Sequence, residues 1–210
     1  MTRRHDPFSS ALASLRARIE AGRDAPGQPI VIQDEARRLR LSTTPVREAL
    51  GWLCGYGLVE RGPTGGFFAP RMEAADLADA YRFRLTCLSA AAELGDPQVA
   101  ATADSSGPVC ASVEGVMEDA VRATGSSALL SAYQRIASRL APFRAAERAV
   151  LGEDDIDRSL LLRHPPEGAG PRWLEGLQAW HQRRITAAPR LVMVAGRLRD
   201  DVDRGGEATP

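Results

Sequence analysis

The stretch Ile32–Pro70, IQDEARRLRLSTTPVREALGWLCGYGLVERGPTGGFFAP, decides the fold of this 210-residue chain. It begins with a short helical pattern in which Ala36 and Leu39 face inward. A second helical pattern follows after a tight turn, and a Gly-rich hairpin comes directly after that. This order predicts a winged helix-turn-helix, a fold that places its second helix in the major groove of DNA.

The second helix of this motif has the start signals and the apolar stripe of a buried helix. Ser42 or Thr44 is the expected N-cap, and Pro45 lies in the first turn, where its missing N–H group costs nothing. At about 100° per residue, three apolar side chains lie together on one side. They are Val46, Leu50 and Leu53.

The opposite side of this helix has the chemistry of a DNA-reading surface. Arg47 and Thr44 point away from the apolar stripe, and Gly51 leaves room for the wall of the groove. An arginine can bind O6 and N7 of guanine with two hydrogen bonds, so Arg47 is the best candidate reader of a base or a phosphate. The hydroxyl groups of Ser42, Thr43 and Thr44, together with the helix N-terminus, suit a phosphate.

Two short β-like runs, at 58–61 and 66–69, predict a two-stranded hairpin, the wing. Its tip contains Gly65 and Gly66, which can approach the DNA backbone or the minor groove closely because they have no side chain. Turn geometry alone explains these glycines equally well, so both interpretations stay open.

The basic residues are unusual in kind and in distribution. All 27 are arginines, which excludes enzymes that need a Schiff-base or P-loop lysine. Residues 1–71 hold 11 arginines and 7 acidic residues, a net charge of +4, whereas residues 72–210 hold 16 and 20, a net charge of −4. The basic part coincides with the winged helix, as expected of a phosphate-binding domain.

Other motifs are absent from the sequence. The three cysteines are far apart and form no CxxC pair, so neither a disulfide framework nor a zinc ribbon is expected. No signal peptide or apolar run of membrane-spanning length is present, so we expect a cytoplasmic protein without a membrane partner. No GxSxG, GxGxxG or HExxH motif occurs, so we expect no enzyme and no catalytic residues.

The remainder of the chain is rich in Ala, Leu and Arg and has no further strand signal. We therefore expect a mostly α protein with three parts: a winged helix-turn-helix domain at 1–71, an all-α helical-bundle domain at 72–204 and a disordered tail at 205–210. One helix is expected near 8–21, before the motif. The helices expected after it lie near 73–94, 109–123, 127–150, 155–163, 171–187 and 189–203.

The segment STTPVREALGWLCGYGLVERGPTGGFFAP resembles the winged-helix signature of GntR-family transcriptional regulators, and the resemblance covers roughly residues 8–70. It implies a double-stranded DNA operator as the partner. Thr43, Asp34 and Arg40 depart from the family pattern, which often has Arg, a polar reader and Gly there. Together with the arginines that can replace the lost charge, the expected DNA-binding residues are Arg37, Arg38, Ser42, Thr43, Thr44, Arg47, Gly65 and Gly66.

The helical part resembles, more weakly, the effector and dimerisation domain of the FadR-like (FCD-type) branch of that family. Many members of the branch hold a metal ion with one Asp and three His. Only His164 and His181 occur in this part of the chain, so the full set is impossible and we expect no metal and no cofactor.

An arginine clamp inside the bundle is the simplest way to receive an anionic effector without a metal. The candidate effector-binding residues are Arg84, Arg135, Arg139 and His181. A packed or surface histidine and solvated arginines are the alternative interpretation of the same residues.

Together, these patterns predict a ligand-responsive transcription regulator, a repressor that binds a roughly palindromic operator as a homodimer and responds to a small anionic metabolite. The alternative is a DNA-binding protein whose helical domain serves only dimerisation or partner recruitment, without an effector site.

Overall fold

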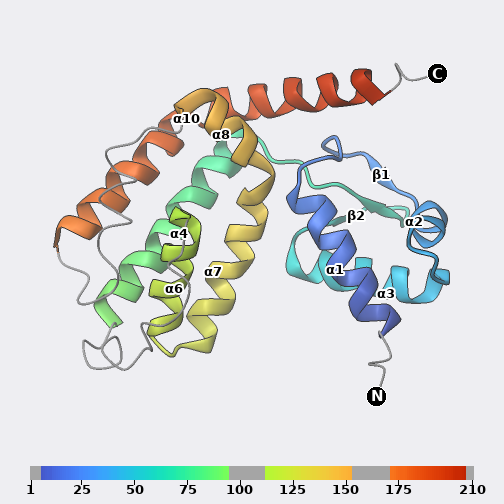
Figure 1. Ribbon diagram of the computed structural model, residues 1–210, viewed down its shortest axis with the longest axis horizontal. Coiled ribbons are helices and arrows are strands. Elements are labelled where there is room, and N and C mark those ends of the chain that lie inside the picture. Colours follow the sequence, from blue (N-terminus) through green and yellow to red (C-terminus); the bar gives the residue numbers. More distant parts are fainter. Residues whose placement is uncertain (1–5, 95–111, 153–170, 207–210) are drawn as a thin grey trace. The chain divides into compact units, whose positions relative to one another are not determined.

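The computed structural model of the chain describes residues 6–94, 112–152 and 171–206 (Figure 1). These residues fall into two compact units. The first comprises Met1–Glu73, Ser138–Ala146 and Val192–Pro210, and the second comprises Ala74–Ala137 and Glu147–Leu191. The domain limits expected at residues 71 and 204 stay predictions. The helix expected at 155–163 and the end of the expected tail lie outside the described residues.

The winged helix of the first unit begins with three helices: α1 (Pro7–Glu20), α2 (Ile32–Leu39) and α3 (Thr43–Tyr56). Helix α1 begins at the N-cap Asp6, whose carboxylate accepts hydrogen bonds from the backbone N–H groups of Phe8 and Ser9. Helix α1 packs along α3 (Figure 1), and α2 packs on α3 as well. This arrangement confirms the predicted helix-turn-helix.

The sheet has one strand more than the sequence predicts. Strands β1 (Pro29–Ile30), β2 (Glu60–Arg61) and β3 (Phe67–Phe68) form an antiparallel sheet in the order β1-β3-β2. Ile30 and Arg61 both pair with Phe67, so β3 is the central strand. The expected two-stranded hairpin is therefore correct for β2 and β3, but β1 joins it from a part of the chain about 30 residues earlier.

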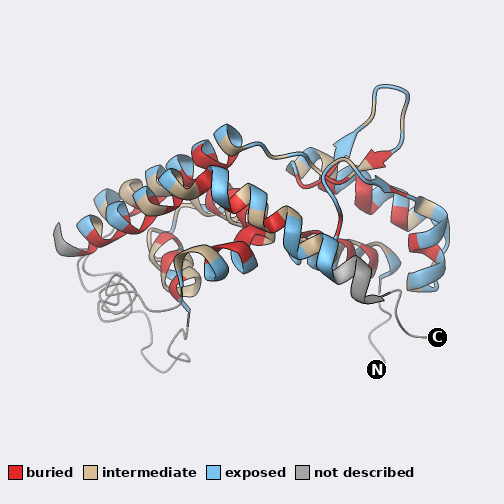
Figure 2. Cartoon of the chain, turned by 90° about the horizontal axis from the view of Figure 1, so that it is seen from above, coloured by how far each residue is buried: buried red, intermediate tan, exposed pale blue. Residues whose placement is uncertain are grey.

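The core of the winged helix is the predicted one. The α3 stripe of Val46, Leu50 and Leu53 is fully buried, as is Leu15 of α1. Figure 2 shows these helices with buried residues on one side and exposed residues on the other. At roughly 2 kcal/mol for each buried aliphatic side chain, this cluster is the main source of stability for the fold.

Two features of the winged helix depart from the predicted pattern. Glu35 of α2 is a charged residue in a buried position, 3% exposed. Its carboxylate forms ion pairs with Arg18 of α1 and with Arg38, and Arg18 also pairs with Asp24.

The other feature is Arg40, which ends α2 in the left-handed conformation with φ 56°. This conformation favours glycine.

The second unit is helical throughout its described residues. Its helices include α4 (Ala74–Leu94), α6 (Val113–Ala123) and most of α7 (Ser127–Leu140). The sequence predicts one helix over 127–150, which is wrong. A 3₁₀ turn, η1 (Ala141–Phe143), separates α7 from α8 (Arg144–Leu151). Pro142 lies at the start of η1 and has no N–H group to continue the α-helical bonding of α7.

The last helix, α10 (Pro171–Gly206), is continuous, although the sequence predicts two helices separated before Pro189. A proline inside a helix removes one backbone hydrogen bond and costs about 3 kcal/mol. Ala188 and Leu191, on either side of it, are buried at 1% and 0% exposure, so packing offsets this cost. No helix in the described ranges is long and apolar enough to cross a membrane.

Candidate DNA-binding surface and buried arginine site

The exposed side of α3 carries the predicted DNA-reading residues. Arg47 and Thr44 are exposed, and no described residue forms an ion pair with Arg47. Gly51 is exposed as well, and a Cβ atom placed on it would meet no other atom within 4 Å. Packing therefore does not require glycine at this position, and the surface beside Arg47 is open for a groove wall.

The N-terminus of α3 is available to an anion. Ser42, one of the two expected candidates, is the N-cap, but its side chain makes no capping hydrogen bond. Ser42, Thr43 and Thr44 are all exposed. The first backbone N–H groups of α3 therefore lie beside three hydroxyl groups, which is an arrangement that suits a phosphate oxygen.

The two candidate arginines of α2 differ in how strongly each side chain is already held by a carboxylate. Arg37 has an 80% exposed side chain, and its contact with Asp34 is long at 3.4 Å. Arg38 donates from Nε and Nη2 to Glu35 at 3.0 and 2.6 Å, and Nη2 also donates to Ser14 at 3.3 Å. A phosphate can recruit Arg37 at little cost, whereas Arg38 would have to share its guanidinium with a buried carboxylate.

The tip of the wing is built by turn geometry. Gly65 and Gly66 have φ values of 96° and 83°, which side-chain-bearing residues rarely adopt. The backbone N–H of Gly65 donates to the carbonyl of Gly62 at 3.0 Å, which closes the turn. In Figure 2 the loop between β2 and β3 stands away from the sheet. The turn thus explains both glycines, and it leaves the tip free to approach DNA.

A second cluster of arginines lies inside the second unit. Arg84 of α4 is only 3% exposed, and its Nε donates to Nε2 of His181 on α10 at 3.1 Å. His181 is fully buried, and its Nδ1 donates to the carbonyl of Leu177 at 2.7 Å. This second bond fixes the tautomer that leaves Nε2 as an acceptor. The Nη2 atom of Arg84 is buried without any hydrogen-bond partner.

Three other members of the cluster form hydrogen bonds: Glu147, Arg184 and Tyr81. Glu147 of α8 accepts from Nε of Arg184 at 2.7 Å and from the hydroxyl of Tyr81 at 2.5 Å. Nη1 of Arg184 donates to the carbonyl of Trp180 at 3.1 Å. Both guanidinium groups lie against the ring of Trp180, with Cζ of Arg84 at 4.7 Å and Cζ of Arg184 at 3.1 Å from its centroid. Such cation–π contacts stabilise a desolvated cation.

Counting the described residues, the cluster has an excess of one positive charge. Burial, and then the neighbouring charge of Arg84, lowers the pKa of His181 well below its usual range, so this histidine is neutral. Burial, and then Glu147, raises the pKa of Tyr81 well above its usual range, so the phenol is neutral as well. Two arginines therefore face one carboxylate. The geometry offers an anion an unpaired guanidinium edge at Nη2 of Arg84.

Comparison with known proteins supports the DNA-binding assignment for the winged helix. Residues 9–69 match the model of the family described as "Bacterial regulatory proteins, gntR family". This segment is a GntR domain. The protein is accordingly a DNA-binding transcription regulator of the GntR type. No curated protein sequence matches the chain.

Solved structures extend the likeness to the helical part. The structure of E. coli McbR/YncC superposes with a TM-score of 0.65 at 18% sequence identity, covering 88% of this chain and 98% of that one. A GntR-family regulator from Pseudomonas syringae pv. tomato str. DC3000 gives 0.40 at 22% identity over 89% and 86%. The Listeria monocytogenes protein Lar gives 0.47 at 14% over 91% and 97%. The first of these shows that the fold beyond the GntR domain is shared.

The structure brings together only part of the predicted effector set. Arg84 and His181 are in direct contact, but Arg135 is exposed on α7. Arg139 belongs to the first unit, whereas the buried cluster is built from residues of the second. The effector-binding role expected of these four residues stays a prediction. Spacing along a helix does not show which turns of α7 belong to the interior of the second unit.

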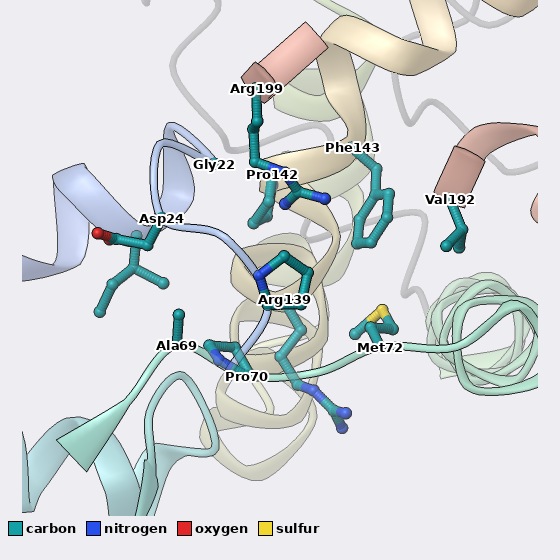
Figure 3. Close-up of a pocket in the computed structure, with 12 residues that line it drawn as sticks. Gly22, Asp24, Ala69, Pro70, Met72, Arg139, Pro142, Phe143, Val192 and Arg199 are labelled. Atoms are coloured by element: carbon teal, nitrogen blue, oxygen red, sulfur yellow. The ribbon is translucent and has the colours of Figure 1, made fainter. Parts of the chain in front are cut away.

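Arg139 lines a different, small cavity, which lies within the first unit (Figure 3). The cavity has a volume of about 50 Å³, against several hundred Å³ for a metabolite site. In Figure 3 the guanidinium of Arg199 reaches toward Pro142, while that of Arg139 extends away from it. The side chains do not converge on one point, so this cavity has room for a water molecule but not for an effector.

Sequence reasoning missed Arg184, Glu147 and Tyr81. Arg184 follows His181 by three residues, so helical spacing could have placed both on one side of α10. No comparable signal exists for Glu147, which reaches the cluster from a separate helix. Among the described residues, no group of three His, Cys, Asp or Glu side chains could hold a metal ion. The expectations of no cofactor and no enzyme activity stay predictions.

Proposed function

We propose that this GntR-type regulator is a cytoplasmic repressor that binds a palindromic operator as a homodimer and is controlled by a small anionic effector. In this proposal the second unit is the effector and dimerisation domain of the FadR-like branch. The effector binds at Arg84, with His181 holding the guanidinium in place. The observation that carries the proposal is the buried Nη2 atom of Arg84, which has no partner in a cluster with excess positive charge.

The DNA contacts of the proposal follow from exposure and pairing. Arg47 reads a base because it is exposed and unpaired beside the open surface at Gly51. The hydroxyl groups of Ser42, Thr43 and Thr44 bind phosphate. Arg37 and the wing tip, with Gly65 and Gly66, contribute further backbone contacts. Arg38 contributes least because Glu35 already holds it.

The effector site follows from the cost of an unsatisfied buried donor. Leaving a buried polar group without a partner costs about 1–3 kcal/mol, and more for a charged group. An anion that accepts from Nη2 of Arg84 removes this cost and neutralises the excess charge. The bond from Nε to His181 orients the planar guanidinium, so Nη2 can donate to one oxygen of a carboxylate.

The DNA part of the proposal is tested by a gel-shift assay on an operator selected from random DNA. Arg47→Ala should lower selective binding about 10- to 100-fold, because one bidentate base contact contributes about 1–3 kcal/mol. Arg82→Ala is the matched control, since Arg82 is an exposed arginine outside the GntR domain. Equal selectivity in wild type and Arg47→Ala would show that another residue reads the operator.

The effector part is tested by thermal unfolding of the full chain with a panel of small carboxylates. A ligand at Arg84 should raise the melting temperature of the wild type, and Arg84→Met should abolish this shift. The same ligand should change operator affinity in the gel-shift assay. If no carboxylate stabilises the chain, the alternative holds, in which the second unit serves only dimerisation or partner recruitment.

A further inference from the structure

Helix α3 carries a tryptophan on its solvent-facing side. Trp52 is 43% exposed, and no described residue accepts a hydrogen bond from its indole N–H group. Its ring stacks on that of Tyr56, with 4.9 Å between the ring centroids and 14° between the planes. Cζ of Arg16 lies 5.5 Å from the centroid of the Tyr56 ring. These contacts restrict the orientation of an indole that is otherwise open to solvent.

This tryptophan and Arg47 belong to one continuous surface of α3. At about 100° per residue, Gly51 and Gly55 are turned by about 40° and 80° from Arg47, and Trp52 follows at about 140°. Both glycines are exposed. The exposed acid Glu48 lies nearer the start of α3, in the half of a recognition helix that faces base edges.

Packing within the described chain does not explain the two glycines. A Cβ atom placed on Gly51 or Gly55 would meet no other atom within 4 Å, and neither residue has a positive φ. Glycine is also the least favourable residue inside a helix apart from proline. The missing side chains therefore leave α3 open to close approach from outside.

The dimensions of α3 identify what approaches this surface. Residues 9–69 are a GntR domain, and a recognition helix lies in the major groove of DNA. The groove is about 12 Å wide and a helix is about 10–12 Å in diameter, so the sugar-phosphate backbone passes close to the helix. Helix α3 has 14 residues and is about 21 Å long. When its first turns face the bases, its later turns lie beside the backbone.

We propose that the operator backbone passes over Gly51 and Gly55, and that the indole N–H group of Trp52 donates to a phosphate oxygen. An indole N–H group can only donate a hydrogen bond, and phosphate oxygens accept such bonds from proteins. Phosphate contacts fix the position of a protein on DNA but carry no sequence information. Trp52 thus anchors α3 on the backbone, while Arg47 reads the bases. This inference rests on the proposed function, in which the Arg47 side of α3 faces DNA.

Trp52→Phe tests the phosphate contact in a gel-shift assay, because phenylalanine keeps an aromatic ring on Tyr56 but has no donor. Binding to the operator should weaken about tenfold. Binding to unrelated DNA of the same length should weaken by the same factor, since phosphates are alike in every sequence. The salt dependence of binding should stay the same, because an indole carries no charge and displaces no counterion.

Acrylamide quenching of tryptophan fluorescence reports on the same contact. The chain has three tryptophans, and Trp173 and Trp180 are only 6% and 3% exposed, so quenching of the free protein comes mainly from Trp52. Operator DNA should reduce the quenching of the wild type. It should leave the quenching of Trp52→Phe unchanged.

Substitution of Gly55 should have two effects of opposite sign. Alanine favours a helix, so Gly55→Ala should raise the melting temperature by about 2–4 °C, yet it should weaken DNA binding. Gly55→Leu places a larger side chain against the backbone and should weaken binding about tenfold. Gly196→Ala is the matched control, at a glycine of α10 outside the GntR domain whose Cβ would also meet no atom within 4 Å. It should raise the melting temperature without changing DNA affinity.

The outcomes separate this inference from the proposed reading of DNA by Arg47. Unchanged affinity in Trp52→Phe or in Gly55→Leu overturns the contact at that residue, while lost selectivity in Arg47→Ala leaves the proposed function standing. Weaker binding by Trp52→Phe without protection of the wild type from acrylamide also overturns the phosphate contact. If Arg47→Ala keeps its selectivity as well, the proposed orientation of α3 fails together with this inference.

Discussion

Each of the two units contains a cluster of ion-paired side chains. The clusters differ in whether their positive and negative charges are equal in number. In the winged helix, Arg18 and Arg38 face Glu35 and Asp24, so two positive charges meet two negative ones. Both arginines of this cluster are partly exposed, with side chains at 29% and 44%. One oxygen of Asp24 lacks a partner, but its other oxygen is bound by Arg18.

In the part of the second unit that the structure describes, two arginines meet a single carboxylate. Arg84 and Arg184 are 3% and 8% exposed, and Glu147 is 6% exposed. At this depth Nη2 of Arg84 has no hydrogen-bond partner. A balanced, partly hydrated cluster serves to hold α1 against α2. The unbalanced cluster of the second unit is where we propose that an anion binds.

The largest expected loss of stability comes from removing the negative charge of the cluster in the second unit. Glu147→Ala removes the only carboxylate that described residues contribute to the second cluster, and it takes away the ion-pair partner of the buried Arg184. Breaking a buried ion pair in this way costs about 3–5 kcal/mol in the free energy of unfolding. Urea denaturation of the full chain measures the loss. Asp119→Ala, at an exposed acid of α6, is the control and should change the free energy by less than about 0.5 kcal/mol.

A loss below about 1 kcal/mol for Glu147→Ala would show that Arg184 reaches water or another acceptor, and the contrast between the clusters would fail. In the double variant Glu147→Leu/Arg184→Met, much of the lost stability should return, since apolar residues of similar size often replace a buried pair without cost.

Breaking the cluster of the winged helix, whose charges are balanced, should lower the free energy of unfolding by less. Glu35→Ala frees Arg18 and Arg38, whose side chains are exposed enough to be hydrated, so we expect a loss of about 2 kcal/mol by the same urea experiment. Asp34→Ala, at the exposed neighbour in α2, should be close to neutral. If Glu35→Ala destabilised the chain as much as Glu147→Ala does, exposure of the arginines would not be what distinguishes the two clusters.

The neutral histidine of the second cluster predicts a pH dependence. The folded pKa of His181 is depressed by burial and by Arg84, whereas the unfolded chain protonates histidine near pH 6.5. The unfolded state therefore binds more protons below this pH, and stability falls as the pH drops while it is constant above. Between pH 7 and 5.5 the loss should be about 1 kcal/mol.

His181→Gln provides the comparison for this effect, because glutamine keeps an acceptor for Arg84 but does not titrate. Urea denaturation at both pH values should show the pH-dependent loss in the wild type and a smaller one in the variant. The same loss in both proteins would assign the pH dependence to other groups.

The smallest expected effect is an increase in stability. Arg40 ends α2 with φ 56° and ψ 42°, a conformation that is unfavourable for a residue with a Cβ atom. Arg40→Gly should raise the free energy of unfolding by about 0.5–1 kcal/mol, as measured by thermal unfolding. Arg40→Ala keeps the Cβ atom and should give no gain. A gain of equal size from both variants would point to charge rather than backbone conformation.

The winged helix could be predicted because its signals are local. The cap at Ser42, the proline in the first turn and the stripe of Val46, Leu50 and Leu53 all lie within one helix. They fix which side of α3 faces the core, and thereby which side carries Arg47. The exceptions are long-range: β1 joins the sheet from residues 29 and 30, and Glu35 is buried only because Arg18 of α1 reaches it.

The effector set could be predicted only in part because burial inside a helical bundle depends on several helices. The sequence shows that Arg84 and His181 lie on helices, and the structure shows that they are in contact. The same reasoning did not show that Arg135 is exposed on α7 or that Arg139 belongs to the first unit. Helix continuity was misjudged at Pro142 and Pro189 for a related reason, since packing decides whether a proline breaks a helix.

The sequence by itself determined the GntR domain, the mostly helical fold and the exposed position of Arg47, because 3.6-residue periodicity, capping residues and turn glycines act over a few neighbouring positions. Only the tertiary structure decided that Arg84 lacks a partner, that Glu147 is shared by Arg184 and Tyr81, and that Trp173 has an unpaired donor. Those properties depend on how many charged groups and hydrogen-bond acceptors several helices contribute to one buried region. No local sequence pattern shows that number.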